Sequence, residues 1–153
     1  MAMQFSFKRS FLLSLLLPIA LVLGGCQSTE ERIVELKAKA EKGDVAAMVE
    51  LGEIFYGAQM VDWSDTEGAK WMKMAAEKGN AKAQHMMGIA YSKGLGVPID
   101  RVEAHKWAFL SSCKGFVESA KSMKDIEATM SVKEVQQAKN IEKQFEGCTN
   151  KTF

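Results

Sequence analysis

Two histidines, His85 and His105, and three cysteines are the side chains of this sequence best suited to metal binding, proton transfer or nucleophilic attack. The histidines fall in different predicted helices of one hairpin, and no HExxH, CxxC or GxSxG motif accompanies them. A single helical histidine without such a motif is more often a surface or groove residue than a ligand. We therefore predict no enzyme, no catalytic residue, no metal site and no cofactor, and we infer no small-molecule substrate.

Cys26 follows a segment that is typical of an export signal. MAMQFSFKRS carries positive charge, FLLSLLLPIALVL is an apolar run of 13 residues, and LGGC comes next. A run of this length is too short for a membrane-spanning helix and indicates a signal peptide over residues 1–25. The alternative is a signal peptide in which the last cysteine is accidental.

The tetrapeptide Leu-Gly-Gly-Cys resembles a bacterial lipobox. The resemblance implies cleavage before Cys26, a diacylglyceryl group on its thiol and acylation (palmitate, for example) of its new amine, and several acyl chains make a stable anchor. The residue after the cysteine is Gln27 and not Asp. In lipoproteins of Gram-negative bacteria, a residue other than Asp at this position implies transfer to the outer membrane. We expect a lipid-anchored protein that faces the periplasm, with residues 26–28 as a short tether.

The two remaining cysteines, Cys113 and Cys148, are expected to form a disulfide. The exported compartment is oxidising, and no other cysteine is left once Cys26 is lipidated. Cys113 occupies the repeat position of Glu41 and Glu77, a solvent-facing place that is unusual for a free thiol. The alternative is two unpaired cysteines.

A decapeptide occurs twice, as GDVAAMVELG at 43–52 and GNAKAQHMMG at 79–88, 36 positions apart. Cap residues follow the same period, each with a glutamate three residues later, as in a capping box. These pairs are Ser28 with Glu31, Ser64 with Glu67 and Asp100 with Glu103. Asp44 and Asn80 are further predicted caps, and the last helix is expected to start at Ser131 with Glu134. A helix therefore starts at a cap every 36 residues and ends near Gly43, Gly79 or Gly115.

Apolar periodicity between these signals predicts seven helices, at residues 29–42, 45–56, 65–78, 81–92, 101–114, 116–129 and 132–146. Gly52 and Gly88 fall inside helices at a cost of about 1 kcal/mol each, which indicates that another helix approaches there. A single helix pair cannot bury its apolar face, so the units must stack. The predicted fold is all-α, a short α-solenoid of antiparallel helix pairs with a C-terminal capping helix.

The pattern resembles the Sel1-like repeat family, relatives of tetratricopeptide repeats, over residues 43–115. The first copy carries the resemblance through Gly43, Ala47, Leu51, Gly52, Phe55, Ala69, Trp71, Ala75, Ala76 and Gly79, and the second through Ala83, Gln84, Gly88, Tyr91, Gly94, Gly96, Val97, Pro98, Asp100, Ala104 and Trp107. By resemblance, such proteins are adaptors that bind other proteins and have no catalytic residues of their own. Flanking the repeats we expect a capping helix at 29–42, a capping helix pair at 116–148 and a tail at 149–153.

We expect the partner, a protein or peptide, to bind a groove lined by the first helix of each pair. The predicted groove residues are Val49, Glu53, Tyr56, His85, Ile89, Ser92, Lys121 and Asp125. Removal of the signal peptide leaves 18 basic against 19 acidic residues, a near-neutral balance that argues against nucleic acid. The sequence thus favours a periplasmic protein–protein interaction adaptor, and the alternative is a cell-wall-associated enzyme or its obligate regulatory subunit.

Overall fold

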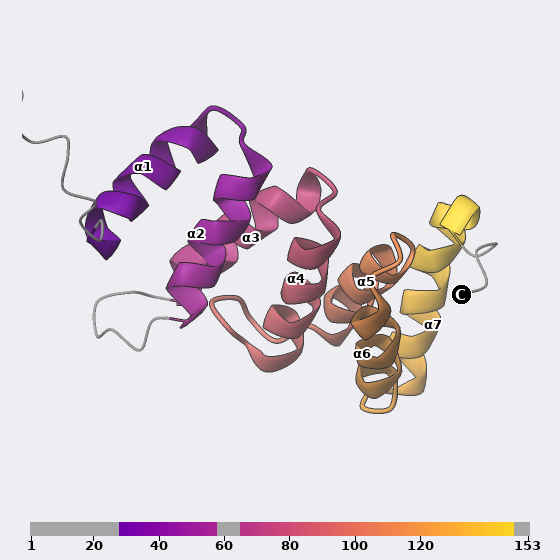
Figure 1. Ribbon diagram of the computed structural model, residues 1–153. Helices are drawn as coiled ribbons and strands as arrows, with labels where there is room; N and C mark the ends of the chain where they lie inside the picture. The colour runs from indigo at the N-terminus through magenta and orange to yellow at the C-terminus, as the bar shows by residue number, and fades with distance from the viewer. Residues whose placement is uncertain (1–27, 58–64, 149–153) are drawn as a thin grey trace, which may run out of the picture.

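The computed structural model describes residues 28–57 and 65–148, and within these ranges it contains helices and no strand. The elements are α1 (Thr29–Glu41), α2 (Val45–Gly57), α3 (Asp65–Glu77), α4 (Ala81–Lys93), α5 (Arg101–Ser112), α6 (Val117–Glu127), α7 (Val132–Glu142) and the 3-10 helix η1 (Lys143–Cys148). From α1 to α6 each helix packs on the next, and α7 packs on α5. Figure 1 shows α1 at one end of the stack and α7 at the other. The predicted α-solenoid is confirmed.

Five helices begin at a predicted cap, whereas α6 begins after Phe116, whose side chain makes no cap hydrogen bond. Ser28 with Glu31 and Ser131 with Glu134 form complete capping boxes, with each side chain bonded to the other's backbone amide. Three further predicted cap side chains, those of Asp44, Asn80 and Asp100, accept hydrogen bonds from first-turn amides. The cap predicted at Ser64 lies outside the described residues.

The carboxyl ends of the helices differ most from the prediction. Gly43, Gly79 and Gly115 adopt positive φ just beyond α1, α3 and α5, the left-handed geometry that ends a helix. The last helix was predicted to run to residue 146, but α7 ends at Glu142 and continues as η1, with non-helical dihedrals at Phe145. Tighter 3-10 turns are common where a helix ends.

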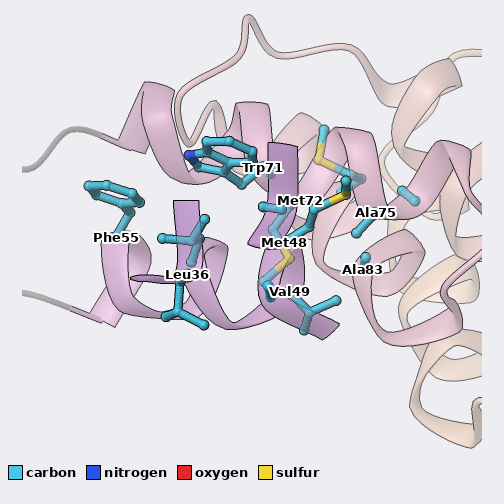
Figure 2. Close-up of a cluster of buried hydrophobic side chains, with 14 of the residues drawn as sticks. Leu36, Met48, Val49, Phe55, Trp71, Met72, Ala75 and Ala83 are labelled. Carbon is cyan, nitrogen blue, oxygen red and sulfur yellow. The ribbon is translucent and has the colours of Figure 1, made fainter. Parts of the chain in front are cut away.

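The core lies between the helix pairs and is built from repeat-equivalent positions. Leu51, Met72 and Met87 are fully buried, and Trp71 and Trp107 are 5% and 7% exposed. Figure 2 shows Trp71 and Met72 of α3 beside Met48 of α2 and Leu36 of α1. Burial of a large apolar side chain contributes roughly 1.5–3 kcal/mol, so this core holds α1 to α4 together. A second cluster, of Ala104, Ala108 and Ile126, joins α5 to α6.

Gly52 and Gly88 lie where the other helix of the pair approaches, as predicted. A Cβ on Gly88 would lie 3.2 Å from the carbonyl oxygen of Ala104 and 3.3 Å from the amide nitrogen of Ala108, both on α5. A Cβ on Gly52 would lie within 3.0 Å of side-chain atoms of Met72 on α3. The absence of a side chain therefore lets α4 approach the backbone of α5 and α2 accommodate the buried Met72.

The first helix is packed against the repeats and is not a free linker. Ile33, Leu36 and Ala40 are buried in the main core, and Arg32 forms an ion pair with Glu50 of α2. Within the described ranges, no helix is long and apolar enough to cross a membrane. The predicted signal peptide and Cys26 lie outside those ranges.

We expect α1 to show slow amide hydrogen exchange, but less protection than α3, because α1 buries only three side chains. Exchange measured by mass spectrometry on the full chain tests this. A Leu36→Ala variant should lose about 2–5 kcal/mol of local packing and open α1, while protection of α4 is kept. Coil-like exchange throughout α1 of the unaltered protein would contradict the packed arrangement.

Candidate partner-binding surface

The exposed side of the first helices, α2, α4 and α6, carries the charged residues predicted for the groove. Glu53 on α2 forms an ion pair with Lys82 on α4, and this pair connects the first helices of consecutive repeats. Lys121 and Asp125 lie one turn apart on α6, with 3.5 Å between Nζ and Oδ2, and both are strongly exposed. Exposed pairs of this kind add little stability and stay accessible to a partner.

Val49 was predicted to line the groove, and this is wrong. It is 9% exposed and belongs to the same buried cluster as Ala83 of α4. Its repeat equivalent, His85, likewise contacts the following first helix, α6, through Phe116 and Ser119. The series 49, 85 and 121 therefore faces the next repeat, and only Lys121, after which no further repeat follows in the described chain, is fully exposed.

Tyr56, Ile89 and Ser92 are half-buried at the edge of this surface. The Tyr56 hydroxyl donates to the Leu95 carbonyl at 3.4 Å, which ties the end of α2 to the loop after α4. Burial, with a smaller effect of the Asp65 charge, raises the pKa of Tyr56 to about 12. Ser92 donates to the Ile89 carbonyl of its own helix at 2.9 Å, so its proton is already used.

His85 takes part in a chain of buried hydroxyl groups that sequence reasoning did not find. Its Nδ1 is 2.9 Å from Oγ of Ser119, Ser119 donates to Oγ of Ser111 at 2.7 Å, and Ser111 donates to the Ala81 carbonyl at 2.7 Å. Ser111 and Ser119 are completely buried. Ser119 therefore positions the imidazole, and its burial leaves it no access to a substrate as a nucleophile.

His105, the other histidine, is buried at 3% exposure between α5 and α7. Its Nε2 is 3.7 Å from Oε1 of Glu142, and its Nδ1 has no hydrogen-bond partner. Burial lowers the pKa of His105, while the charges of Glu142 and Glu127 oppose this effect. A neutral, enclosed imidazole of this kind supports packing of the capping helix.

The stability of the protein should fall as the pH drops from about 7.5 to 5.5, because the unfolded chain then binds a proton at His105 that the folded protein resists. The loss begins near the ordinary histidine pKa of about 6.5. Urea unfolding at several pH values measures it, and a His105→Leu variant should show a shallower dependence. Equal slopes for both proteins would assign the pH dependence to other groups.

Two surface hollows among the described residues lie away from the predicted groove. A cavity of about 630 Å³ separates the start of α5 from α7 and is lined by Ile99, Asp100, Arg101, Val102, Glu134, Gln137, Asn140 and Ile141. A second, of about 400 Å³, lies between α3 and the loop at Gly96 and Val97. Neither is lined by a histidine or by a predicted groove residue, and the described residues contain no group of three metal-ligating side chains.

Two predicted covalent sites are not tested by these observations. Cys26 lies outside the described residues, as does the side chain of Cys148. Cys113 is the C-cap residue of α5. Lipidation of Cys26 and the pairing of Cys113 with Cys148 stay predictions.

Comparison with solved structures supports the same fold. A protective antigen of uropathogenic Escherichia coli with an SLR fold aligns with a TM-score of 0.71 and 29% identity, over 80% of this chain and 27% of that chain. A Sel1 repeat protein from Oxalobacter formigenes aligns with a TM-score of 0.55 and 27% identity, over 60% of this chain and 37% of that one.

Two curated relatives are fungal. Chitin synthase regulatory factor 3 of Schizosaccharomyces pombe is 34% identical over 82 residues, 54% of this chain and 9% of the relative. Chitin synthase regulator SKT5 of Malassezia restricta is 48% identical over 44 residues, 29% of this chain and 3% of the relative. The chain thus spans less than a tenth of the curated relatives that it matches.

The family model described as Sel1 repeat matches residues 45–80 and 81–116, close to the limits predicted from the glycine period. The helix pairs of the structure and its Sel1-like structural neighbours agree with this match. Repeats of this kind support protein–protein interaction, which is the role expected for the exposed face of the first helices. The chain therefore contains two consecutive Sel1 repeats, at residues 45–80 and 81–116.

Proposed function

We propose that the protein is a membrane-anchored adaptor that binds a protein partner along its first helices, α2, α4 and α6. The observation that carries the proposal is the exposed, charged face of these helices in a chain of Sel1 repeats, where Glu53, Lys121 and Asp125 lie open to solvent. Tyr56, His85, Ile89 and Ser92 add half-buried contacts to it. Stacked helical repeats offer extended surfaces of this type to other proteins.

Crosslinking in intact cells followed by purification tests this surface. Charge reversal at Glu53, Lys121 and Asp125 should remove a crosslinked protein, because recognition usually depends on a few residues. The matched control reverses three exposed charges on the second helices, Lys73 and Glu77 of α3 and Lys139 of α7, and should leave that protein bound. If the first variant kept every crosslinked protein, the first helices would not be the binding surface.

The same proposal places the protein on the periplasmic side of an outer membrane through acyl chains on Cys26. Its support is the sequence: a positive segment and an apolar run before LGGC, and Gln27 after it. Because α1 begins at Thr29, only Gln27 and Ser28 separate the anchor from the packed helices. Two or three extended residues reach about 7–10 Å, so the repeats would stay close to the membrane surface.

Membrane fractionation separates this location from others. The unaltered protein should co-sediment with outer membranes and incorporate labelled palmitate, because several acyl chains give stable anchoring. A Cys26→Ser variant should lose the label. Unlabelled protein recovered from the soluble fraction would contradict the anchor. It would not affect the proposal that the first helices bind a protein partner.

A second candidate, the obligate regulatory subunit of a cell-wall-associated enzyme, is favoured by the names of two relatives, a chitin synthase regulatory factor and a chitin synthase regulator. It requires no catalytic site in this chain. The crosslinked partner distinguishes the two: a cell-wall enzyme whose activity falls when the adaptor is deleted supports the regulator. A partner with no such activity supports the general adaptor.

A further inference from the structure

The hydroxyl chain behind His85 fixes which ring nitrogen carries the proton. The Ala81 carbonyl can only accept, so Ser111 must use its single proton there. Ser119 must then donate to Ser111, which leaves Ser119 only as an acceptor toward His85. The neutral imidazole is therefore protonated at Nδ1, and its Nε2 carries the free lone pair.

The Nε2 atom of the half-buried His85 is not fully enclosed. It has no hydrogen-bond partner within the described part of the chain, and it is not among the buried unpaired polar atoms, whereas Nδ1 of His105 is. The Phe116 ring lies 5.0 Å from the His85 ring, centroid to centroid, and covers part of it. His85 thus offers an oriented hydrogen-bond acceptor from a packed support.

The repeat also places an unpaired carboxylate beside this acceptor. Glu53 and Lys82 join α2 to α4, and 36 residues later the equivalent positions are Ile89 and Glu118, on α4 and α6. Helices α4 and α6 are in contact, and the charge of Glu118 acts on His85. Glu118 is exposed and, within the described ranges, forms no ion pair. The contact between α4 and α6 therefore has an anion at this position and no cation to pair with it.

We infer that His85, Glu118 and Ile89 form a site, here called the His85 site, for a lysine or arginine side chain of the protein partner. The cation's N–H groups donate to Nε2 of His85 and to the Glu118 carboxylate, and its alkyl chain lies on Ile89. It thereby gives Glu118 an opposite charge, as Glu53 gives one to Lys82 in the preceding repeat. Charge-assisted hydrogen bonds of this kind are the stronger ones, and arginine suits two acceptors in one plane. The inference rests on the proposed function, because the cation belongs to the bound protein.

The imidazole is tested first in the protein alone. Long-range ¹H–¹⁵N spectra of the full chain with labelled histidine should show His85 protonated at Nδ1 above pH 7, and a His105→Gln variant assigns the signals, since the chain has only two histidines. A Ser119→Ala variant should return His85 to the tautomer mixture of free histidine. A proton on Nε2 in the unaltered protein would overturn the inference.

The cation is tested by titration with acetyl-arginine amide, with the citrulline analogue as the neutral control. Arginine should shift the His85 Nε2 signal saturably, with a dissociation constant on the order of millimolar, and citrulline should not. A Glu118→Gln variant should weaken binding at least ~5-fold, as expected for a lost charge-assisted bond. Its matched control is Glu30→Gln, because Glu30 is also an exposed glutamate in the first turn of a helix.

A His85→Asn variant separates binding from folding. Its side-chain amide can still donate to Ser119 from the position of Nδ1 but has nothing at the position of Nε2, so arginine binding should be lost with little change in thermal midpoint. Equal shifts with citrulline, no effect of Glu118→Gln, or no saturable shift up to about 20 mM would each overturn the site. The titration uses purified protein, so its failure would leave the crosslinking result, and with it the adaptor, unaffected.

Discussion

Replacement of Gly96 by alanine is expected to destabilise the protein by at least about 3 kcal/mol, because two costs add. Gly96 has φ of +69°, a left-handed conformation that costs an L-residue with a side chain roughly 1–2 kcal/mol. A Cβ there would also overlap the Asp65 carbonyl and lie 2.7 Å from the Thr66 nitrogen, at the start of α3. Backbone atoms cannot turn aside as a flexible side chain can, so the loop must separate from α3.

Two other glycines provide a graded control, measured by thermal or urea unfolding. Gly94 has φ of +77°, but its Cβ would meet the flexible side chain of Ile99, so Gly94→Ala should cost about 1–2 kcal/mol. Gly57 ends α2, and no atom of the described residues lies within 4 Å of an added Cβ, so Gly57→Ala should change stability by less than about 1 kcal/mol. Similar losses at all three positions would show that the close approach of the loop to α3 is not what Gly96 provides.

The comparison of Gly96 with the helix caps shows which parts of the fold the sequence could predict. Caps and helix ends depend on neighbours three or four residues away, so Ser28, Asn80 and Asp100 were recognised from local spacing and are confirmed. The repeat then extended local signals to the whole stack. Gly96 and Asp65 are 31 residues apart, and no local pattern connects the two segments. The repeat pattern therefore identified Gly96 but could not predict that it lies against Asp65.

The candidate surface was predictable only in part, for the same physical reason. Residues 36 positions apart occupy equivalent places, and this spacing correctly assigns Leu51 and Met87 to the core. It does not show whether an equivalent pair outside the core faces solvent or the next repeat. Val49 and His85 turned toward the next repeat. The hydroxyl chain to Ser111 required two serines on different helices to meet, and nothing in their spacing indicated that.

The second large effect is expected from loss of the predicted disulfide between Cys113 and Cys148. Arg101 faces Glu134 at 3.9 Å and His105 faces Glu142 at 3.7 Å, so α5 and α7 run in the same direction. Their carboxyl ends, the C-cap Cys113 and the end of η1 at Cys148, therefore lie at the same end of the helix pair. The Cys113 thiol is not free in the structure, and its pairing with Cys148 stays a prediction.

Cys113→Ser or Cys148→Ser should each destabilise the oxidised protein by about 4 kcal/mol, because the bond closes a loop of roughly 35 residues in the unfolded chain. The double variant distinguishes a bond from two separate thiols. If the cysteines are paired, either single change removes the same bond, so the double variant should be no less stable than the singles. Reductant should lower the unaltered protein to the same level and leave the variants unchanged. Additive losses in the double variant, or two free thiols in unreduced protein by mass spectrometry, would show that the cysteines are unpaired. The capping helix α7 would then be held to α5 by packing and by the contact of His105 with Glu142.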